Sequence, residues 1–270
     1  MKDFPPVSPL SGSTLKLVAI ITMTIDHFAA GIIYFMLVTW RFPEDIGFER
    51  LYQIYLVLRG IGRTAFPIYC FLLIEGLLHT HSRIRYLINL LLFAVLSELP
   101  FDLIATDTLT DPMSLDIPKL IYDNRPEIYE HQNVFLTLAI GLAACWIIEE
   151  FRRRYGVRPI TFLVAVPATA GAFYLAEATN TDYGGIGVLV IMCFYFLHSI
   201  RLAALGCAFF VLSRLYLEVW AFPAFILILF YSGKRGFIGN SPARKYFFYI
   251  YYPAHLFLFF LMRTWILGMF

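Results

Sequence analysis

The stretch LKLVAIITMTIDHFAAGI (15–32) is apolar along most of its length, yet it carries an aspartate and a histidine, Asp26 and His27, in its second half. A helix needs about 20 apolar residues to cross the hydrocarbon core of a bilayer, and this run continues to about residue 38. A charged side chain inside the bilayer costs about 2.5 kcal/mol or more unless it is paired, hydrated or functional. The stretch therefore predicts a transmembrane helix that carries part of a functional site.

The composition places the whole chain in the same class. Of its 270 residues, 60% are hydrophobic and only 15% are charged, and the mean hydropathy is +0.71. Soluble proteins have about 45–50% apolar and about 25% charged residues, so a globule of this size would lack the polar side chains to cover its surface. The net charge of +2 does not suggest a nucleic-acid partner. The 4 cysteines lie apart within apolar runs, as buried cysteines do.

Roughly nine apolar segments, bounded by charged or turn residues, are candidate spans. They cover about residues 15–38, 52–78, 84–104, 132–149, 159–177, 184–199, 202–216, 219–232 and 244–268. The segments between 184 and 232 are short, so we expect a re-entrant or tilted piece among them. The prediction is an all-α polytopic transmembrane helix bundle of about nine spans (8–10) that forms one integral-membrane domain over residues 1–270.

Basic residues favour one orientation of this bundle. If the N-terminus is cytoplasmic, the inner loops hold Lys2, Arg83, Arg85, Arg152, Arg153, Arg154, Arg158, Arg201, Lys234, Arg235, Arg244 and Lys245. The outer side then holds Arg41, Arg50, Lys119, Arg125 and Arg214, and an acidic loop with Asp107, Asp111, Asp116, Asp123, Glu127 and Glu130. This excess of positive charge on one side predicts a cytoplasmic N-terminus.

Five ionisable residues are predicted to lie in the middle or outer half of the bilayer. At 1.5 Å per residue, His27 lies about 18 Å into the first helix from its inner start, and His255 about 17 Å along the last. Glu98 lies about 21 Å along the third helix, and Arg59 and Arg63 about 10–17 Å from the outer start of the second. Prolines at positions 67, 100 and 253 free main-chain carbonyls close to these side chains. We therefore expect one intramembrane site around a cavity.

The partners of Asp26 and His27 are expected on other helices, because adjacent residues point about 100° apart on a helix. Arg59 and Arg63 are four residues apart and share one face, which suits recognition of a phosphate or a carboxylate.

Each of these residues also has a purely structural interpretation. An isolated membrane histidine is more often a hydrogen-bonding core residue than a base. One of the arginines can form an ion pair with Glu98 or Asp102, which share a face of the third helix.

Several motifs together resemble one known family. They are LKLVAIITMTIDHFAAGI (15–32), LRGIGRTAFPIYCFLLIEGLLHT (58–80), LLFAVLSELPFDL (91–103), NVFLTLAIGL (133–142), TDYGGIGVLVI (181–191) and YSGKRGFIGN…KYFFYIYYPAHL (231–256). In this order they are similar to the TraX family of bacterial inner-membrane proteins, whose founding members are needed for N-terminal acetylation of conjugative pilin. The first-helix histidine and the arginine pair also resemble those of type-3 membrane acyltransferases, although the arginines here are spaced Arg-x-x-x-Arg where those enzymes have Arg-x-x-Arg.

The resemblance implies transfer of an acetyl or other short acyl group from cytoplasmic acetyl-CoA to an amine or hydroxyl acceptor at or across the bacterial inner membrane. For this chemistry we expect His27, Asp26 and Glu98 as catalytic residues, with Glu98 and Asp102 orienting the arginines or the histidine. The implied substrate- and CoA-binding residues are Arg59, Arg63, Asp102, Asn133, Asp182, Tyr252 and His255. The acceptor stays open among a pilin-like peptide, a sugar and a lipid-linked glycan, and no metal cofactor is expected.

Two other functions remain open at this point. A small transporter or channel would use His27, Arg59, Arg63 and Glu98 as a proton or anion relay, but the sequence shows no internal repeat. A structural assembly subunit would have no ligand for these charges, and it predicts that they pair with one another.

Overall fold

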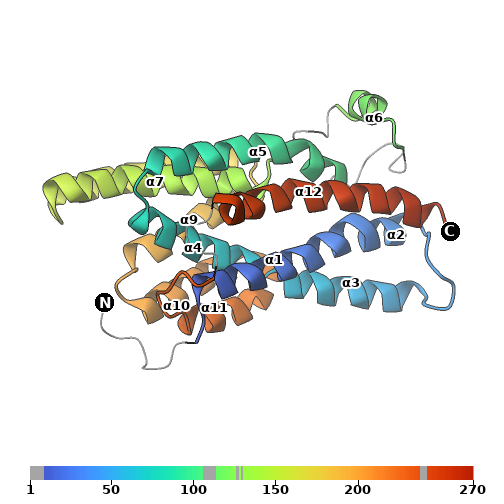
Figure 1. Ribbon diagram of the computed structural model, residues 1–270, viewed down its shortest axis with the longest axis horizontal. Coiled ribbons are helices and arrows are strands. Elements are labelled where there is room, and N and C mark those ends of the chain that lie inside the picture. Colours follow the sequence, from blue (N-terminus) through green and yellow to red (C-terminus); the bar gives the residue numbers. More distant parts are fainter. Residues whose placement is uncertain (1–8, 106–113, 126–127, 129, 238–241, 270) are drawn as a thin grey trace.

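The computed structural model describes residues 9–105, 114–125, 128, 130–237 and 242–269, with only the main chain of 242–245. Within them the chain is helical, with two isolated β-bridges, Leu10–Tyr231 and Gln132–Thr181. The elements are α1 (Gly12–Phe28), η1 (Ala29–Ile33), α2 (Tyr34–Val38), α3 (Phe48–Gly62), α4 (Ala65–His79), α5 (Arg83–Ala105), α6 (Ile117–Asp123), α7 (Val134–Tyr155), α8 (Pro159–Ala178), α9 (Gly184–Phe196), α10 (Arg201–Leu212), η2 (Tyr216–Ala221), α11 (Phe222–Leu229) and α12 (Pro242–Leu267) (Figure 1).

Among the described residues, 6 helical stretches are long and apolar enough to cross a membrane. They are Gly12–Val38, Phe48–His79, Arg83–Ala105, Val134–Tyr155, Pro159–Ala178 and Tyr246–Leu267. Gly184–Phe196, Arg201–Leu212 and Tyr216–Leu229 are apolar but shorter. The all-helical, multi-pass membrane architecture is thus confirmed, whereas the count of about nine spans is not, because the segments predicted at 184–199, 202–216 and 219–232 are too short by this measure.

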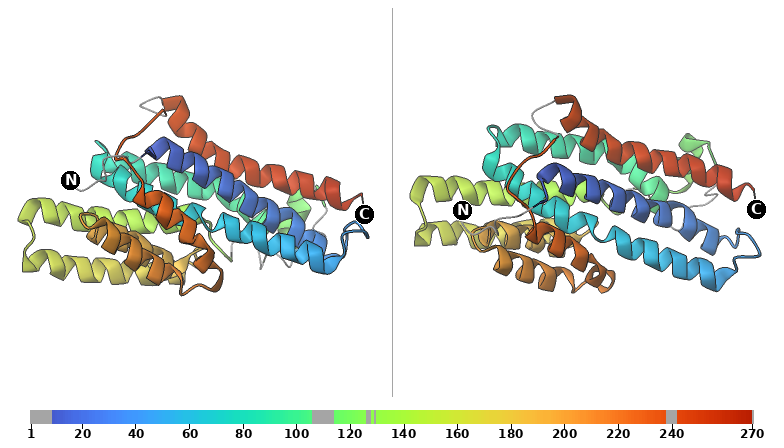
Figure 2. Two further views of the ribbon diagram at one scale, coloured as in Figure 1. Left: turned by 90° about the horizontal axis from the view of Figure 1, so that it is seen from below. Right: turned by 60° about the horizontal axis from the view of Figure 1, so that its bottom comes forward.

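The helices form two groups that are offset along the long axis of the molecule. Helices α7 and α8 reach one end, whereas α2, α3 and the C-terminal part of α12 reach the other (Figures 1 and 2). Helix α5 joins the groups by packing on both α7 and α12, and α4 does so by packing on both α1 and α9. The inner parts of these helices share one large hydrophobic core. Because of the offset, α9 begins and α8 ends part-way along the longer helices.

Four irregularities in the long helices lie close to the predicted polar residues. A π-helical turn, Ala29–Ile33, follows directly after His27 and Phe28. The predicted second span is broken between α3 and α4 at Arg63 and Thr64, where Pro67 in the first turn of α4 has no N–H for the Arg63 carbonyl. The other two expected prolines, at positions 100 and 253, lie inside α5 and α12. π-turns and broken helices in membrane proteins are common at functional sites.

The basic residues that were predicted to lie on the same side of the membrane include several that lie together in the structure. Arg83 at the start of α5 forms ion pairs with Glu149 and Glu150 at the end of α7, at 3.9 and 3.3 Å. Arg152 and Arg153 both bond to the buried Glu149, at 2.8 and 3.1 Å. These basic residues therefore gather at one end of the bundle, although which end is cytoplasmic stays a prediction. Lys2 and the loop residues Asp107, Asp111 and Glu127 lie outside the described residues, as do the side chains of Arg244 and Lys245.

Candidate functional site

A cavity of about 330 Å³ lies where the two helix groups meet. Its walls come from α1, α3, α4, α5 and α12, the start of α7, and the loop between α8 and α9. Of the predicted site residues, Asp26, His27, Arg59, Arg63, Asp182 and Tyr252 line it. These six residues, five from helices or a helix end and Asp182 from a loop, are thus brought together from segments far apart in sequence.

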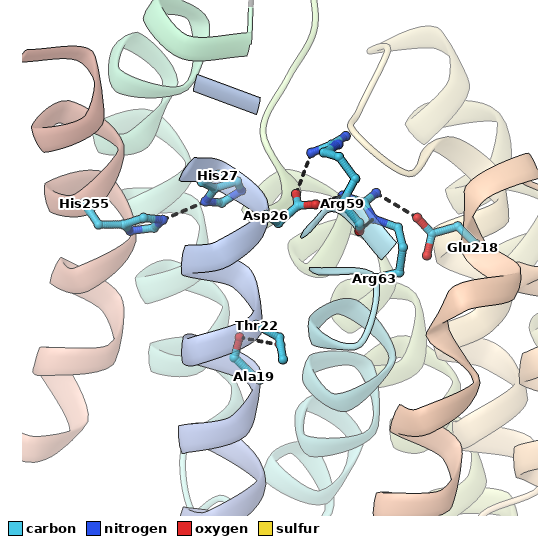
Figure 3. Close-up of polar contacts among 8 residues, drawn as sticks. All are labelled: Ala19, Thr22, Asp26, His27, Arg59, Arg63, Glu218 and His255. Atoms are coloured by element: carbon cyan, nitrogen blue, oxygen red, sulfur yellow. Dashed lines mark hydrogen bonds and ion pairs between the residues drawn. The ribbon is translucent and has the colours of Figure 1, made fainter. Parts of the chain in front are cut away.

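Asp26 holds both arginines. Its Oδ2 accepts a hydrogen bond from Nη1 of Arg59 at 2.7 Å, and its Oδ1 accepts one from Nη2 of Arg63 at 2.5 Å (Figure 3). Asp26 is only 6% exposed, so it ties α1 to α3 by buried, charge-assisted bonds. Gly62 permits this approach, because a Cβ at that position would clash with the Asp26 side chain. Asp26 therefore orients the arginines and points away from His27, which does not fit the catalytic role predicted for it.

Glu218 is a site residue that the sequence analysis missed. Its Oε1 accepts a bond from Nη1 of Arg63 at 2.8 Å, and the residue is buried in the short helix η2. The sequence signal was available: Glu218 is an acidic residue directly before an apolar segment that is too short to span a bilayer.

The two arginines differ in how many of their guanidinium nitrogens remain without a hydrogen-bond partner. Arg63 uses every guanidinium nitrogen, since its Nε donates to the carbonyl of Arg59 at 3.2 Å while its other two nitrogens bind Asp26 and Glu218. Arg59 uses only Nη1, and its buried Nε has no hydrogen-bond partner among the described residues. Arg59 thus retains donors for a ligand in the cavity, whereas Arg63 is a structural cation.

His27 is paired with a second histidine. Its Nδ1 lies 2.6 Å from Nε2 of His255, and Nδ1 of His255 lies 2.7 Å from the main-chain oxygen of Tyr251. A carbonyl oxygen only accepts, so Nδ1 of His255 carries a proton, and in the neutral ring its Nε2 is an acceptor. Nδ1 of His27 must then be the donor, which leaves Nε2 of His27 with a free lone pair. Among the described residues no hydrogen bond occupies that atom, and His27 lines the cavity.

Two further polar groups of the cavity have no hydrogen-bond partner among the described residues. The Tyr252 ring lies edge-on to the His27 ring, with centroids 5.6 Å apart, and its hydroxyl is buried without a partner in the described part of the chain. Asp182, in the loop before α9, lines the cavity, and the structure gives its carboxylate no hydrogen bond or ion pair to a described residue. The cavity therefore offers a base, a carboxylate, a phenol and a guanidinium.

The remaining predicted residues lie outside the cavity. Asn133 caps α7, and its amide donates to the carbonyl of Ala94 and to the carboxylate of Glu98. The expectation that Glu98 orients the arginines or His27 is therefore wrong, since its carboxylate bonds to Asn133 instead. Asp102 is buried in α5 but does not line the cavity. The arginines form their ion pairs with Asp26 and Glu218, where we expected Glu98 or Asp102.

This fold and cavity define a multi-pass membrane protein with a polar, partly unpaired site between its helices. The chain belongs to the TraX family, whose model, described as TraX protein, matches residues 11–263. The family resemblance seen in the sequence motifs is thereby confirmed.

One curated relative supports this assignment. It is the "Probable fimbrial assembly protein FimC, serogroup H1" of Dichelobacter nodosus, 30% identical over 265 residues that cover 91% of this chain and 93% of the relative. No solved structure matches the chain.

Proposed function

We propose that the protein is a membrane-bound acyltransferase that moves an acetyl or other short acyl group from cytoplasmic acetyl-CoA to an amine or hydroxyl acceptor. The observation that supports it best is the free Nε2 of His27, which faces a cavity and is fixed in a basic tautomer by His255 and Tyr251. A neutral imidazole within reach of the acceptor proton is what general-base catalysis requires. The family and the fimbrial assembly relative support a role in pilus or fimbrial assembly.

The proposed reaction proceeds in two steps. Nε2 of His27 takes a proton from the acceptor nitrogen or oxygen as that atom attacks the thioester carbonyl, which gives a tetrahedral intermediate with a negative oxygen. The carbon–sulfur bond then breaks, and His27 returns the proton to the sulfur of CoA. Throughout, Nε2 of His255 accepts the hydrogen bond that Nδ1–H of His27 donates, and it so stabilises the imidazolium that forms between the steps.

The unpaired groups in the cavity have distinct parts in this proposal. Arg59 has free donors for the intermediate oxygen, and the buried Tyr252 hydroxyl is a second donor on the side of His27. The Asp182 carboxylate suits an amine acceptor, which it would position by a charge-assisted bond. A pilin-like peptide, a sugar or a lipid-linked glycan each carries a suitable nucleophile. The bacterial inner membrane is the proposed location, because acetyl-CoA is cytoplasmic.

The proposal is tested with the purified protein in lipid nanodiscs, by following release of free CoA thiol from acetyl-CoA with a pilin-derived peptide, a sugar or a lipid-linked glycan as acceptor. We expect release that depends on one of these acceptors and disappears in His27→Ala. His131→Ala is the matched control, because His131 is exposed and does not line the cavity. Wild-type release by His27→Ala would refute the role of His27, and no release with any acceptor would refute the acyltransferase.

A structural assembly subunit is the second candidate, and one observation favours it. Asp26, Arg59, Arg63 and Glu218 do pair with one another, as that function predicted. The name of the relative also mentions assembly and no chemistry. Against it stand the buried Nε of Arg59 and the buried hydroxyl of Tyr252 beside the cavity, which have no partner among the described residues and which a purely structural cluster has no reason to leave open. The thiol-release assay separates the two functions, and it also separates an enzyme from a transporter or channel.

A further inference from the structure

A second and larger cavity, of about 650 Å³, adjoins the central one. Its walls include the start of α1, the end of α4, the start of α5 and the loop after α11. Four residues line both cavities: Met23, Tyr69, Val134 and Tyr252. The two spaces therefore meet at a shared wall beside His27, and the larger one extends to the end of the bundle where the basic residues gather.

The loop that forms one rim of the larger cavity is held in place by main-chain bonds. The main-chain nitrogens of Gly12 and Ser13 donate to the carbonyls of Lys234 and Arg235, both at 2.8 Å, and the nitrogen of Ser232 donates to the carbonyl of Leu10 at 2.8 Å. Gly233, in the left-handed conformation with φ 76°, lines the cavity. This loop is the SGKRG motif of the sequence, to which the central site gives no role.

Three lysine or arginine side chains line the larger cavity: Lys16 of α1, Arg85 of α5 and Arg235 of the loop. Arg85 is exposed, and the structure gives its side chain no ion pair to a described residue. The acidic residue in the wall, Glu75, is already engaged, since His198 and Tyr231 bond to its two carboxylate oxygens at 2.8 and 3.2 Å. The cavity thus combines a basic rim with an interior that is mostly apolar and aromatic.

We propose that this cavity binds the phosphorylated nucleotide end of the acyl donor, and that the pantetheine arm passes between Tyr69, Val134 and Tyr252 to reach His27. This inference rests on the proposed acyltransferase function and assigns its donor site to Lys16, Arg85 and Arg235, away from Arg59 and Arg63. Lys16 and His27 are eleven residues apart on one helix (27 − 16), which is about 16 Å. An extended pantetheine arm covers a distance of this order, so the thioester reaches the base while the phosphates stay at the rim.

The first test compares two donors in the variants Arg85→Ala and Arg235→Ala. Each should raise the KM for acetyl-CoA about tenfold or more, because each removes a charge-assisted bond to phosphate. The KM for S-acetylpantetheine, which lacks the nucleotide, should stay unchanged. Lys234→Ala is the matched control, since Lys234 is an exposed neighbour in the same loop that does not line the cavity. Equal KM values for acetyl-CoA in all three variants would overturn the assignment and leave the acyltransferase intact.

The second test measures binding without turnover. Adenosine 3′,5′-bisphosphate is titrated calorimetrically into nanodiscs of zwitterionic lipid that hold the wild type, Arg85→Lys, Arg85→Ala or Lys234→Ala. We expect the wild type and Lys234→Ala to bind the bisphosphate equally well. Arg85→Lys should bind it more weakly, and Arg85→Ala should show no binding.

The outcomes of the binding test separate the two proposals. Binding by a wild type that releases no CoA thiol would support the cavity and refute the proposed function. Equal binding by all four proteins, or none by the wild type, would overturn the nucleotide assignment. If the true ligand is an anionic lipid, none of the four proteins will bind the bisphosphate. Phosphatidylglycerol will then stay bound to the wild type and be lost from Arg85→Ala.

Discussion

Nδ1 of His27 donates a hydrogen bond of 2.6 Å to Nε2 of His255, which lies 228 positions further along the chain. The two rings are stacked, with an interplanar angle of 17°, and His255 is 5% exposed. This bond decides which nitrogen of His27 is basic, because His255 can accept only while its own Nδ1 proton is held by Tyr251. The basic nitrogen of His27 in α1 is thus determined by its partner His255 in α12.

The histidine pair predicts an order of severity among its variants. His27→Ala should abolish acyl transfer while leaving the melting temperature in detergent nearly unchanged, because the ring lies beside a cavity. His255→Phe keeps the stacking but removes the acceptor, so kcat should fall about 10- to 100-fold with little change in KM. Steady-state kinetics of both variants test this order. Full activity in His255→Phe would show that the tautomer is not set by this pair.

The arginines are expected to separate into a structural and a functional residue. Arg63 binds both Asp26 and Glu218 in the interior, so Arg63→Met should cost about 3–5 kcal/mol of stability by leaving buried carboxylates unpaired. Arg59→Lys keeps the charge and one bond to Asp26 but loses the planar donors, so kcat should fall while the melting temperature holds. Thermal denaturation and kinetics of both variants distinguish the roles. A stable Arg63→Met with reduced kcat would reverse the assignment.

Gly62 is predicted to be intolerant of a single methyl group. Its missing Cβ is the space that the Asp26 side chain fills, so Gly62→Ala must push Asp26 away from both arginines. We expect loss of activity and a lower melting temperature. Gly171→Ala is the control, because nothing lies within 4 Å of a Cβ at that helical position and alanine favours a helix by about 0.5–1 kcal/mol. Equal behaviour of the two variants would mean that the Asp26 contacts do not matter.

The sequence was sufficient for the helical membrane fold and for the charged side chains and the histidine that line the central cavity. Polar side chains in apolar runs are costly, so His27, Arg59 and Arg63 were visible without a structure. Their partners were not visible, because helix periodicity does not say which helices pack together. The sequence therefore offered Glu98 and Asp102 for the arginines, where the fold uses Asp26 from α1 and Glu218 from η2. The predicted span count was not confirmed for a related reason, since an apolar stretch of sequence does not show whether its helix is long enough to cross the bilayer.

Val134 is predicted to control passage between the two cavities. It lines both, and it is only partly buried at the first turn of α7. Val134→Trp should close the passage between the two cavities and so reduce the rate of transfer from acetyl-CoA at least about tenfold. Binding of adenosine 3′,5′-bisphosphate in the larger cavity should persist. Val134→Ala should retain both properties, and it controls for the loss of the valine itself. Transfer at the wild-type rate in Val134→Trp would mean that the thioester reaches His27 by another route.

The proposed mechanism also requires the basic end of the bundle to face the cytoplasm, since acetyl-CoA is too large and too charged to cross lipid. Single cysteines at Asp116 and Arg154 test this in a background with Cys207 changed to serine, because Cys207 is the exposed native cysteine in the described part of the chain. Both positions are exposed, and they lie on opposite sides in the predicted topology. An impermeant thiol reagent added to cells with a permeabilised outer membrane should label the cysteine at 116, and should label that at 154 only after lysis. The reverse pattern would place the larger cavity on the outer side, where no acetyl-CoA is available, and would overturn the donor path even if the protein still transferred acyl groups in nanodiscs.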